Sequence, residues 1–216
     1  MNMKKVALVL SGCGVYDGSE IHEAVITLLN IQKNNAQVSF FAPDTMQMHA
    51  INHAEGKEEN CNRNVLVESA RIARGNIAPL SQFDANEFDA LVFPGGFGAA
   101  KNLSDFAVKG AEMSVNKDVE NAILAMQKLG KKIGFICIAP VIGAKVISNG
   151  VKITIGNDAT TAQAIDAMGA QHVNCPADSF VFDEKFNVYS TPAYMLAEDT
   201  VQLDAGIGAM IAKMLK

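Results

Sequence analysis

The segment from Lys132 to Gly143 constrains the fold most, because it joins a buried strand to a helix through a single cysteine. Ile133 to Ile136 is a short apolar run, which is typical of a buried parallel strand. Cys137 follows directly, and the next residues favour a helix with Pro140 in its first turn, where proline is tolerated. Backbone N–H groups converge at such a turn, so we expect a lowered pKa for Cys137 and an anion site beside it. A buried, inert cysteine fits the same position, and both interpretations stay open here.

The composition describes one folded domain without a strong charge bias. At 216 residues the chain fits a single α/β domain, which we expect to cover residues 1–216. Its 49% apolar and 19% charged residues are typical of a soluble globular protein. The net charge of −5 argues against a nucleic-acid partner. No apolar stretch reaches the roughly 20 residues that a membrane-spanning helix needs, so no membrane partner is expected.

The cysteines predict free thiols in a reducing compartment. Cys13, Cys61, Cys137 and Cys175 lie far apart and form no C-x-x-C pair. The apolar part of the N-terminal stretch is too short for a signal peptide, and it continues into a strand pattern. Because disulfides are rare in reducing compartments, these features predict a cytoplasmic protein.

Strand and helix patterns alternate along the chain. Apolar runs predict strands over residues 5–10, 37–42, 90–93, 133–136 and 151–155, and a hairpin over 180–183 and 187–191. Amphipathic patterns predict helices over residues 18–30, 65–74, 116–129, 140–147, 160–168 and 201–215. This alternation predicts a mostly parallel sheet covered on both faces, whose ligands bind at the carboxyl ends of the strands.

Two motifs suggest a cofactor only weakly. Gly12 and Gly14 follow the first strand with the spacing of a dinucleotide fingerprint, but Asp17 occupies the third glycine position. Residues 43–62 form a long polar excursion that contains His49 and His53. Together with Glu58, Glu59 and Cys61 these histidines fit either a metal cluster or a solvated flap, and the spacing favours the flap. We therefore predict no metal and no cofactor.

Several groups fall at the expected carboxyl edge of the sheet. Glu20 and Glu23 lie at the start of the first helix, where Ser19 is a plausible N-cap. Both acids favour the helix macrodipole, and one of them can also point toward the strand ends. Gly95 and Gly96 end another strand, where they form either a tight turn or a backbone that approaches a ligand closely.

These residues carry a resemblance to a known family. Pro94-Gly95-Gly96, followed some forty residues later by Cys137-Ile138-Ala139-Pro140, resembles the class I glutamine amidotransferase-like superfamily. Glu23 shortly after the first strand is similar to its PfpI-like branch. The longer stretches 11–24, 94–103 and 191–197 resemble the ElbB-type glyoxalases, and the likeness runs nearly end to end.

The resemblance implies a flavodoxin-like three-layer sandwich, a nucleophile-elbow cysteine and a homodimer. It also implies a glutathione-independent, cofactor-free glyoxalase that converts glyoxal, a small dicarbonyl, to glycolate, with a protein deglycase-like activity and a loose link to isoprenoid biosynthesis. By residue, Cys137 would form a hemithioacetal and Glu23 would be its carboxyl partner. The backbone of Gly95, Gly96 and Ile138 would hold the oxyanion.

The chain departs from the family pattern in its histidines. No His-x-Glu follows Cys137, because the only later histidine, His172, precedes Val173 and Asn174, so glutamine hydrolysis is not expected. The imidazole usual after the next strand is replaced by residues 156–158. Glu23 would then act as both acid and base, and Glu20, His22, Asn157 and Asp158 are further candidates for lining the site. The alternative function is a thiol redox sensor, or a binding or chaperone-like module without robust turnover.

Overall fold

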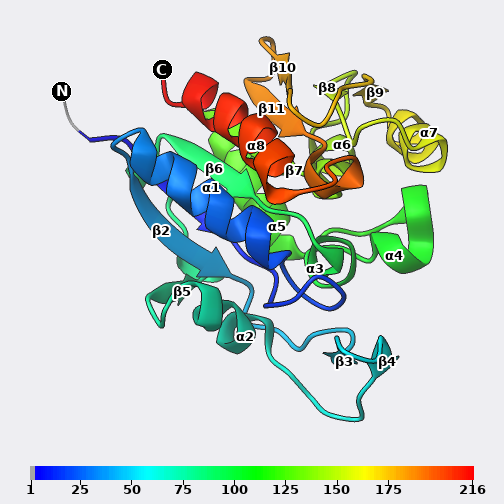
Figure 1. Cartoon of the computed structure of the whole chain (residues 1–216). Helices are drawn as coiled ribbons and strands as arrows, with labels where there is room; N and C mark the ends of the chain where they lie inside the picture. The colour runs from blue at the N-terminus through cyan, green and yellow to red at the C-terminus, as the bar shows by residue number, and fades with distance from the viewer. Residues whose placement is uncertain (1–2) are drawn as a thin grey trace.

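A seven-stranded sheet forms the middle layer of the computed structural model, which describes residues 3–216 (Figure 1). Its order is β10-β11-β7-β6-β1-β2-β5, and every pairing is parallel except that of β10 with β11. The strands are β1 (Lys5–Val9), β2 (Gln37–Ala42), β5 (Ile77–Pro79), β6 (Ala90–Phe93), β7 (Lys132–Ile136), β10 (Val181–Asp183) and β11 (Val188–Thr191). This architecture is the flavodoxin-like α/β fold expected from the sequence.

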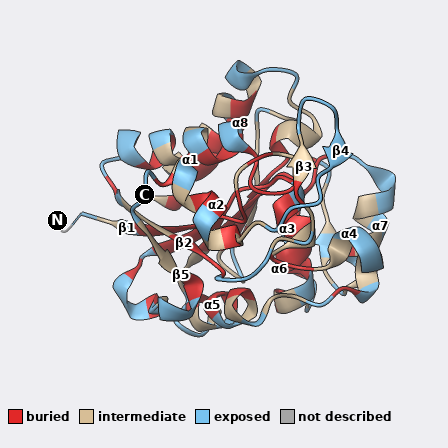
Figure 2. Ribbon diagram, turned by 90° about the horizontal axis from the view of Figure 1, so that it is seen from below, coloured by how far each residue is buried: buried red, intermediate tan, exposed pale blue. Residues whose placement is uncertain are grey.

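Helices cover both faces because the central strands are apolar on both sides. In β1, Val6 and Leu8 pack in the core beneath α1 (Ile21–Lys33) and α8 (Thr200–Met214), whereas Ala7 and Val9 face the opposite core. Against that opposite core pack α5 (Lys117–Lys128) and α6 (Pro140–Ile147). Figure 2 shows the resulting layer of buried strands between exposed helix surfaces. Both apolar faces are therefore used, as a parallel sheet requires.

Shorter elements surround the carboxyl ends of the strands. They are α2 (Val65–Ile72), α3 (Phe97–Lys101), α4 (Phe106–Lys109) and α7 (Ala159–Ala167), with the two-stranded pairs β3 (Ile51–Asn52) with β4 (Lys57–Glu58) and β8 (Lys152–Ile153) with β9 (Gln171–His172). Single 3₁₀ turns are η1 (Leu80–Gln82), η2 (Ala85–Glu87), η3 (Gly110–Glu112) and η4 (Ala193–Met195). The strand predicted over 151–155 is thus shorter, and it pairs outside the main sheet.

The start of α1 also differs from the prediction. Its N-cap is Glu20, whose carboxylate accepts the backbone N–H of Glu23 at 2.7 Å. Ser19, the predicted cap, is buried, and its hydroxyl instead accepts the backbone N–H of Ser11 at 2.8 Å. The helix consequently begins at Ile21 rather than near residue 18. No helix within residues 3–216 combines the length and apolar character that crossing a bilayer would demand.

Candidate active site

Cys137 occupies a strained turn between β7 and α6. Its φ is 62°, in the left-handed region that residues other than glycine rarely adopt. The backbone N–H of Cys137 donates to the carbonyl of Thr191 at 3.0 Å, which ties the turn to the end of β11. The residue is only 8% exposed. Strain held in place by surrounding structure is common at functional sites, and this geometry is that of a tight strand-to-helix turn.

Glu23 lies fully buried beside this sulfur, on the first turn of α1. Its Oε2 accepts the backbone N–H of Gly95 at 2.9 Å, and its Oε1 accepts that of Tyr194 at 3.3 Å. The carboxyl group lies close to the Cys137 side chain, which lowers its pKa slightly. Burial, followed by the negative charge of Glu20, raises the pKa of Glu23 to about 8. Glu23 is therefore largely protonated at neutral pH.

The Cys137 thiol does not have the lowered pKa that its position predicted. Burial raises its pKa well above the ordinary value of 9.0, and the charge of Glu23 raises it further. The nearby backbone N–H groups of Gly96 and Ile138 act in the opposite direction and favour the thiolate. Since Glu23 is largely neutral, its charge is removed and its proton becomes a third donor. The sulfur thus gains an anion-stabilising environment only while Glu23 keeps its proton.

Gly95 and Gly96 explain how the side chains of Glu23 and Cys137 come so close. A Cβ built on Gly95 would lie 2.6 Å from Oε2 of Glu23 and would collide with Cβ of Cys137, so only glycine fits between them. The N–H of Gly95 binds Glu23, which corrects its predicted role as an oxyanion donor. Gly96, with φ of 89°, turns its own N–H toward the sulfur instead. Gly96 and Ile138 therefore remain as candidate oxyanion donors.

Two other predicted positions lie near this pair. Glu20, nearly buried, lines the cavity in front of Cys137. His22 is exposed, and its Nδ1 lies 2.9 Å from the hydroxyl of Tyr194, whose ring lines the same cavity. Tyr194 was missed as a site residue, although its stretch after the last strand belongs to the resemblance. Its N–H to Glu23 and its contact with His22 join α1 to the chain after β11.

Asn157 and Asp158 do not line the site, contrary to the prediction. Both are exposed, and Gly156, with φ of 97°, precedes them. Asp158 is the N-cap of α7, and its Oδ1 accepts the backbone N–H of Thr161 at 2.7 Å. This capping bond lowers the pKa of Asp158 and occupies its carboxylate. Thr161, in the first turn of α7, lines the cavity instead.

The cavity in front of Cys137 has a volume of about 480 Å³. Gly96, Cys137 and Ile138 contribute to it from the ends of the central strands. Its other lining residues come from the loop after β1, from α3, α4 and α7, and from the turn after β11, and they are Val15, Glu20, Phe97, Ala100, Phe106, Ala107, Thr161, Tyr194 and Met195. Most of these side chains are apolar, so the sulfur of Cys137 faces a largely hydrophobic space.

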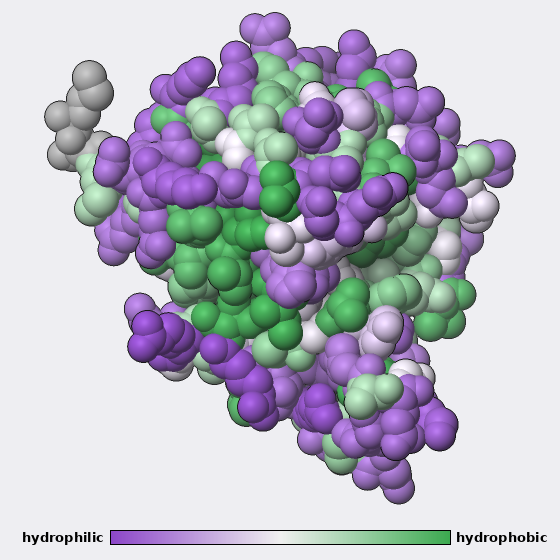
Figure 3. Space-filling view, viewed as in Figure 1, coloured by the Kyte–Doolittle hydropathy of each residue, from purple (hydrophilic) through white to green (hydrophobic). Residues whose placement is uncertain are grey.

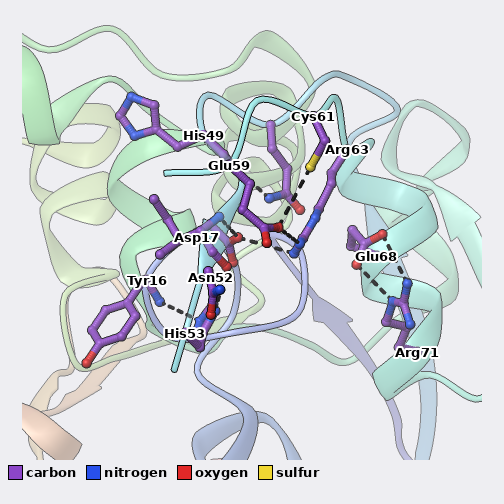
Figure 4. Close-up of polar contacts among 12 residues, drawn as sticks. Tyr16, Asp17, His49, Asn52, His53, Glu59, Cys61, Arg63, Glu68 and Arg71 are labelled. Atoms are coloured by element: carbon purple, nitrogen blue, oxygen red, sulfur yellow. Dashed lines mark hydrogen bonds and ion pairs between the residues drawn. The ribbon is translucent and has the colours of Figure 1, made fainter. Parts of the chain in front are cut away.

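The polar flap of residues 43–62 is anchored next to the first-strand loop (Figure 4). Asp17 is 1% exposed at its side chain and accepts the backbone N–H of Ile51 at 2.7 Å. His53 accepts the backbone N–H of Tyr16 at 3.1 Å through Nε2, and Arg63 lies 3.5 Å from Asp17. Within residues 3–216 no group of three or more His, Cys, Asp or Glu side chains is placed to hold a metal ion. His53 therefore helps to hold the flap against the loop that follows β1.

Comparison with known proteins yields similar sequences over nearly the whole chain. The human glutamine amidotransferase-like class 1 domain-containing protein 3, mitochondrial, is 49% identical, and the match covers 98% of this chain and 82% of that protein. The ES1 protein, mitochondrial, of Danio rerio is 35% identical over 98% of this chain and 85% of its own length. No protein-family model matches the chain.

Solved structures show the same fold. An isoprenoid biosynthesis protein with an amidotransferase-like domain from Ehrlichia chaffeensis superposes with a TM-score of 0.91 at 37% identity, covering 98% of both chains. Glyoxalase III from Candida albicans superposes with a TM-score of 0.65 at 14% identity over 99% of this chain and 98% of its own, which shows a shared fold.

The names of the relatives correct the predicted location. Both relatives are mitochondrial proteins by name, which contradicts the cytoplasmic location expected from the sequence. That expectation rested on separated thiols and on the absence of a secretory pattern. Such features describe the folded domain, and they do not distinguish one intracellular compartment from another.

Proposed function

This chain belongs to the glutamine amidotransferase-like class 1 domain proteins that include the ES1 proteins, and we propose that it is a glutathione-independent glyoxalase of the ElbB type. The observation that carries the proposal is the pairing of Cys137 with a fully buried, largely protonated Glu23. A thiol next to a proton-holding carboxyl group suits chemistry in which sulfur adds to a carbonyl and a proton then moves between carbons. The shared fold with a glyoxalase III supports this choice.

In the first step, the sulfur of Cys137 adds to one aldehyde carbon of glyoxal. The thiol of Cys137 gives its proton to water as the C–S bond forms and the carbonyl π bond opens, and the proton of Glu23 passes to the new alkoxide. We assign the stabilisation of that developing charge to the N–H groups of Gly96 and Ile138, an assignment supported by their effect on the pKa of Cys137. The product is a hemithioacetal, and Glu23 is left as a carboxylate.

The carboxylate of Glu23 then serves as the base. It removes the C–H proton of the hemithioacetal carbon and returns a proton to the neighbouring carbon. The hydroxyl proton of the adduct moves to the neighbouring oxygen at the same time, which turns the adduct into a glycolyl thioester. One carbon is oxidised and the other is reduced, so no external redox partner is needed. Water, deprotonated by Glu23, attacks the thioester, and the C–S bond breaks to release glycolate and regenerate the starting pair. The Glu23 carboxyl thus acts as both acid and base, without an imidazole.

The proposal includes two further features of the family. The same adduct chemistry would allow release of glyoxal adducts from protein side chains, a deglycase-like activity. An indirect link to isoprenoid biosynthesis is supported by the name of the Ehrlichia protein. The redox-sensor alternative is less well supported, because sensor cysteines are accessible and of low pKa, whereas Cys137 is buried and its pKa is raised.

We also propose a homodimer. Ile21, Val25 and Leu29 lie four residues apart on α1 and are 42%, 47% and 44% exposed. Figure 3 shows hydrophobic surface gathered on the face of the molecule that carries α1. A contiguous apolar stripe of this kind is typical of a surface that a partner covers. Light scattering should give twice the monomer mass for the wild type and the monomer mass for Val25→Glu.

The test of the enzyme is conversion of glyoxal to glycolate by purified protein without glutathione. Cys137→Ala should abolish turnover. Cys175→Ala is the matched control, because Cys175 is also a buried free cysteine at 7% exposure but lies outside the cavity. Equal glycolate production by wild type and Cys137→Ala would refute the nucleophile assignment.

A further inference from the structure

The isomerisation moves two protons, and Glu23 carries only one of them. While the carboxyl group of Glu23 transfers the C–H proton between the carbons, the hydroxyl proton of the hemithioacetal has to reach the neighbouring oxygen. Direct transfer between two vicinal oxygens requires a strongly bent hydrogen bond, and bent hydrogen bonds are weak. A second group that exchanges protons with both oxygens would remove this difficulty.

Besides the cysteine, three of the described residues that line the cavity have side chains able to exchange a proton: Glu20, Thr161 and Tyr194. The carboxylate of Glu20 accepts the backbone N–H of Glu23 as the cap of α1. The side chain of Thr161 lowers the pKa of Asp158, which places its hydroxyl at that carboxylate. Glu20 and Thr161 are thus committed to capping helices, and Tyr194 is the candidate that remains.

The turn after β11 places Tyr194 at the cavity. Its backbone N–H donates to Oε1 of Glu23 at 3.3 Å, which holds the ring close to the carboxyl group. The ring lines the cavity, and the residue is half-buried. Burial, followed by the charges of Glu20, Glu23 and Asp199, raises the pKa of Tyr194. The hydroxyl consequently keeps its proton at neutral pH, and it suits a step in which one proton is given up as another is taken.

His22 contacts this hydroxyl from the side of the solvent. Its Nδ1 lies 2.9 Å from the Tyr194 oxygen, and the ring centroids are 5.9 Å apart. His22 is exposed, so its Nε2 is open to water. When Nδ1 carries a hydrogen, as it does in one neutral tautomer and in the imidazolium, His22 donates to the tyrosine oxygen. The hydroxyl hydrogen then points away from the imidazole and is available to the cavity.

We propose that the Tyr194 hydroxyl, oriented by His22, carries the proton between the two substrate oxygens during the isomerisation. The inference rests on the proposed function. Tyr194 gives its O–H proton to the oxygen of the neighbouring carbon as it takes the hydroxyl proton from the hemithioacetal carbon. Two O–H bonds break and two form, so Tyr194 ends the step as it began. Tyr194 is therefore a catalytic residue, and His22 is a positioning residue that acts through it.

Tyr194→Phe tests the hydroxyl, since it keeps the ring and the backbone N–H to Glu23. For glyoxal, kcat should fall about 100-fold or more, which is the usual contribution of a positioned acid–base group. The solvent deuterium isotope effect on kcat should rise and the effect of deuterated glyoxal should fall, because proton transfer between the oxygens then limits the rate. Tyr189→Phe is the matched control, because Tyr189 is buried at 3% exposure outside the cavity, and it should keep the wild-type kcat.

The positioning role of His22 has its own series. His22→Ala should lower kcat about tenfold, the worth of one hydrogen bond, and added imidazole should restore it. His22→Asn offers a side-chain N–H in place of Nδ1–H and should stay within about threefold of wild type. His49→Ala is the matched control, because His49 lies on the flap outside the cavity, and imidazole should not change its kcat. A loss in His22→Ala that imidazole does not restore and His22→Asn shares would overturn the positioning role.

Thermal melts identify the variants that fold, and the His22 series decides the question if Tyr194→Phe does not. Wild-type kcat in Tyr194→Phe, with glycolate formation still dependent on Cys137, would overturn the inference and leave the proposed function intact. A fall in kcat with both isotope effects unchanged would also overturn it, because that is the signature of a structural role. Absence of glyoxal turnover in the wild type would overturn the proposed function, and the role of Tyr194 with it.

Discussion

Replacement of Glu23 by Gln should change how the stability of the protein depends on pH. Glu23 is fully buried, and its pKa is raised from 4.5 to about 8. In the unfolded chain the group loses its proton near 4.5, whereas in the folded protein it keeps the proton until about 8. Its contribution to stability is therefore complete below pH 4.5 and is lost as the pH rises toward 8. At 1.36 kcal/mol for each pH unit, the loss across this window is roughly 5 kcal/mol.

The Gln variant lacks this titration but loses a hydrogen bond. Glu23 accepts N–H groups from both Gly95 and Tyr194, and an amide can accept only one of them through oxygen while its NH₂ faces the other. That mismatch costs roughly 1 to 3 kcal/mol at every pH. Glu23→Gln should consequently be less stable than wild type at pH 4.5 and more stable at pH 8, and the two curves should cross between about pH 5 and 7.

Urea unfolding at half-unit steps from pH 4.5 to 8 measures this directly. Glu20→Gln is the matched control, since it removes the charge that helps raise the pKa of Glu23 and should give a slope between the other two. Cys137 does not interfere, because burial keeps its pKa above 9.0 and thus above the window. Parallel curves for wild type and Glu23→Gln would show that Glu23 titrates normally in the folded protein. The protonated starting state proposed for the reaction would then be wrong.

Three further outcomes follow from the same geometry. Gly95→Ala should lower the free energy of unfolding by about 1 to 3 kcal/mol and abolish turnover, because its methyl group collides with Cys137; thermal melts and glycolate assays check both, and an active, equally stable variant would contradict the close packing. Mass-mapped alkylation should label exposed Cys61 with both iodoacetate and iodoacetamide, but Cys137 with uncharged iodoacetamide only, because Glu20 and no cationic side chain lines the cavity. Equal rates of both reagents at Cys137 would contradict the expected repulsion of anions from the cavity. EDTA should leave glyoxal turnover within about twofold of its initial value, and a loss that zinc restores would favour a metal mechanism instead.

The central strands could be predicted because their signal is local. β1, β6 and β7 are buried on both faces, so nearly every residue in them is apolar. The edge strand β5 was not predicted, since its three residues end in Pro79 and are only half-buried. Segment 151–155 is as apolar as the central strands, yet it pairs with β9 through two residue pairs in a separate sheet. Which strand a segment joins depends on long-range contacts that its own sequence does not contain.

The candidate site likewise combines features that the sequence could predict with features that it could not. The position of Cys137 at a strand-to-helix turn could be predicted from its place in the chain, whereas Glu23 was distinguished from Glu20 only by the family resemblance. The direction of the Cys137 pKa could not, because the helix N-terminus was visible in the sequence whereas the burial that dominates comes from distant segments. Asp158 was misplaced for a related reason. A short acidic residue before a helix is equally suited to capping that helix, and only the fold decides between capping and catalysis.

The left-handed turn at Cys137 bears on how the sequence of this protein can evolve. Glycine adopts that backbone conformation freely and asparagine tolerates it, whereas any other residue costs about 1 to 2 kcal/mol. In a lineage where the chemistry is no longer selected, substitution of Cys137 by Gly or Asn should therefore be retained more often than substitution by Ser, Val or Thr, because Gly and Asn cost less stability at this position. Substitution patterns at this single position would then distinguish descendants that keep the enzyme from those that keep only the fold. In descendants that keep the enzyme, selection for turnover has to oppose the preference of this backbone conformation for Gly or Asn.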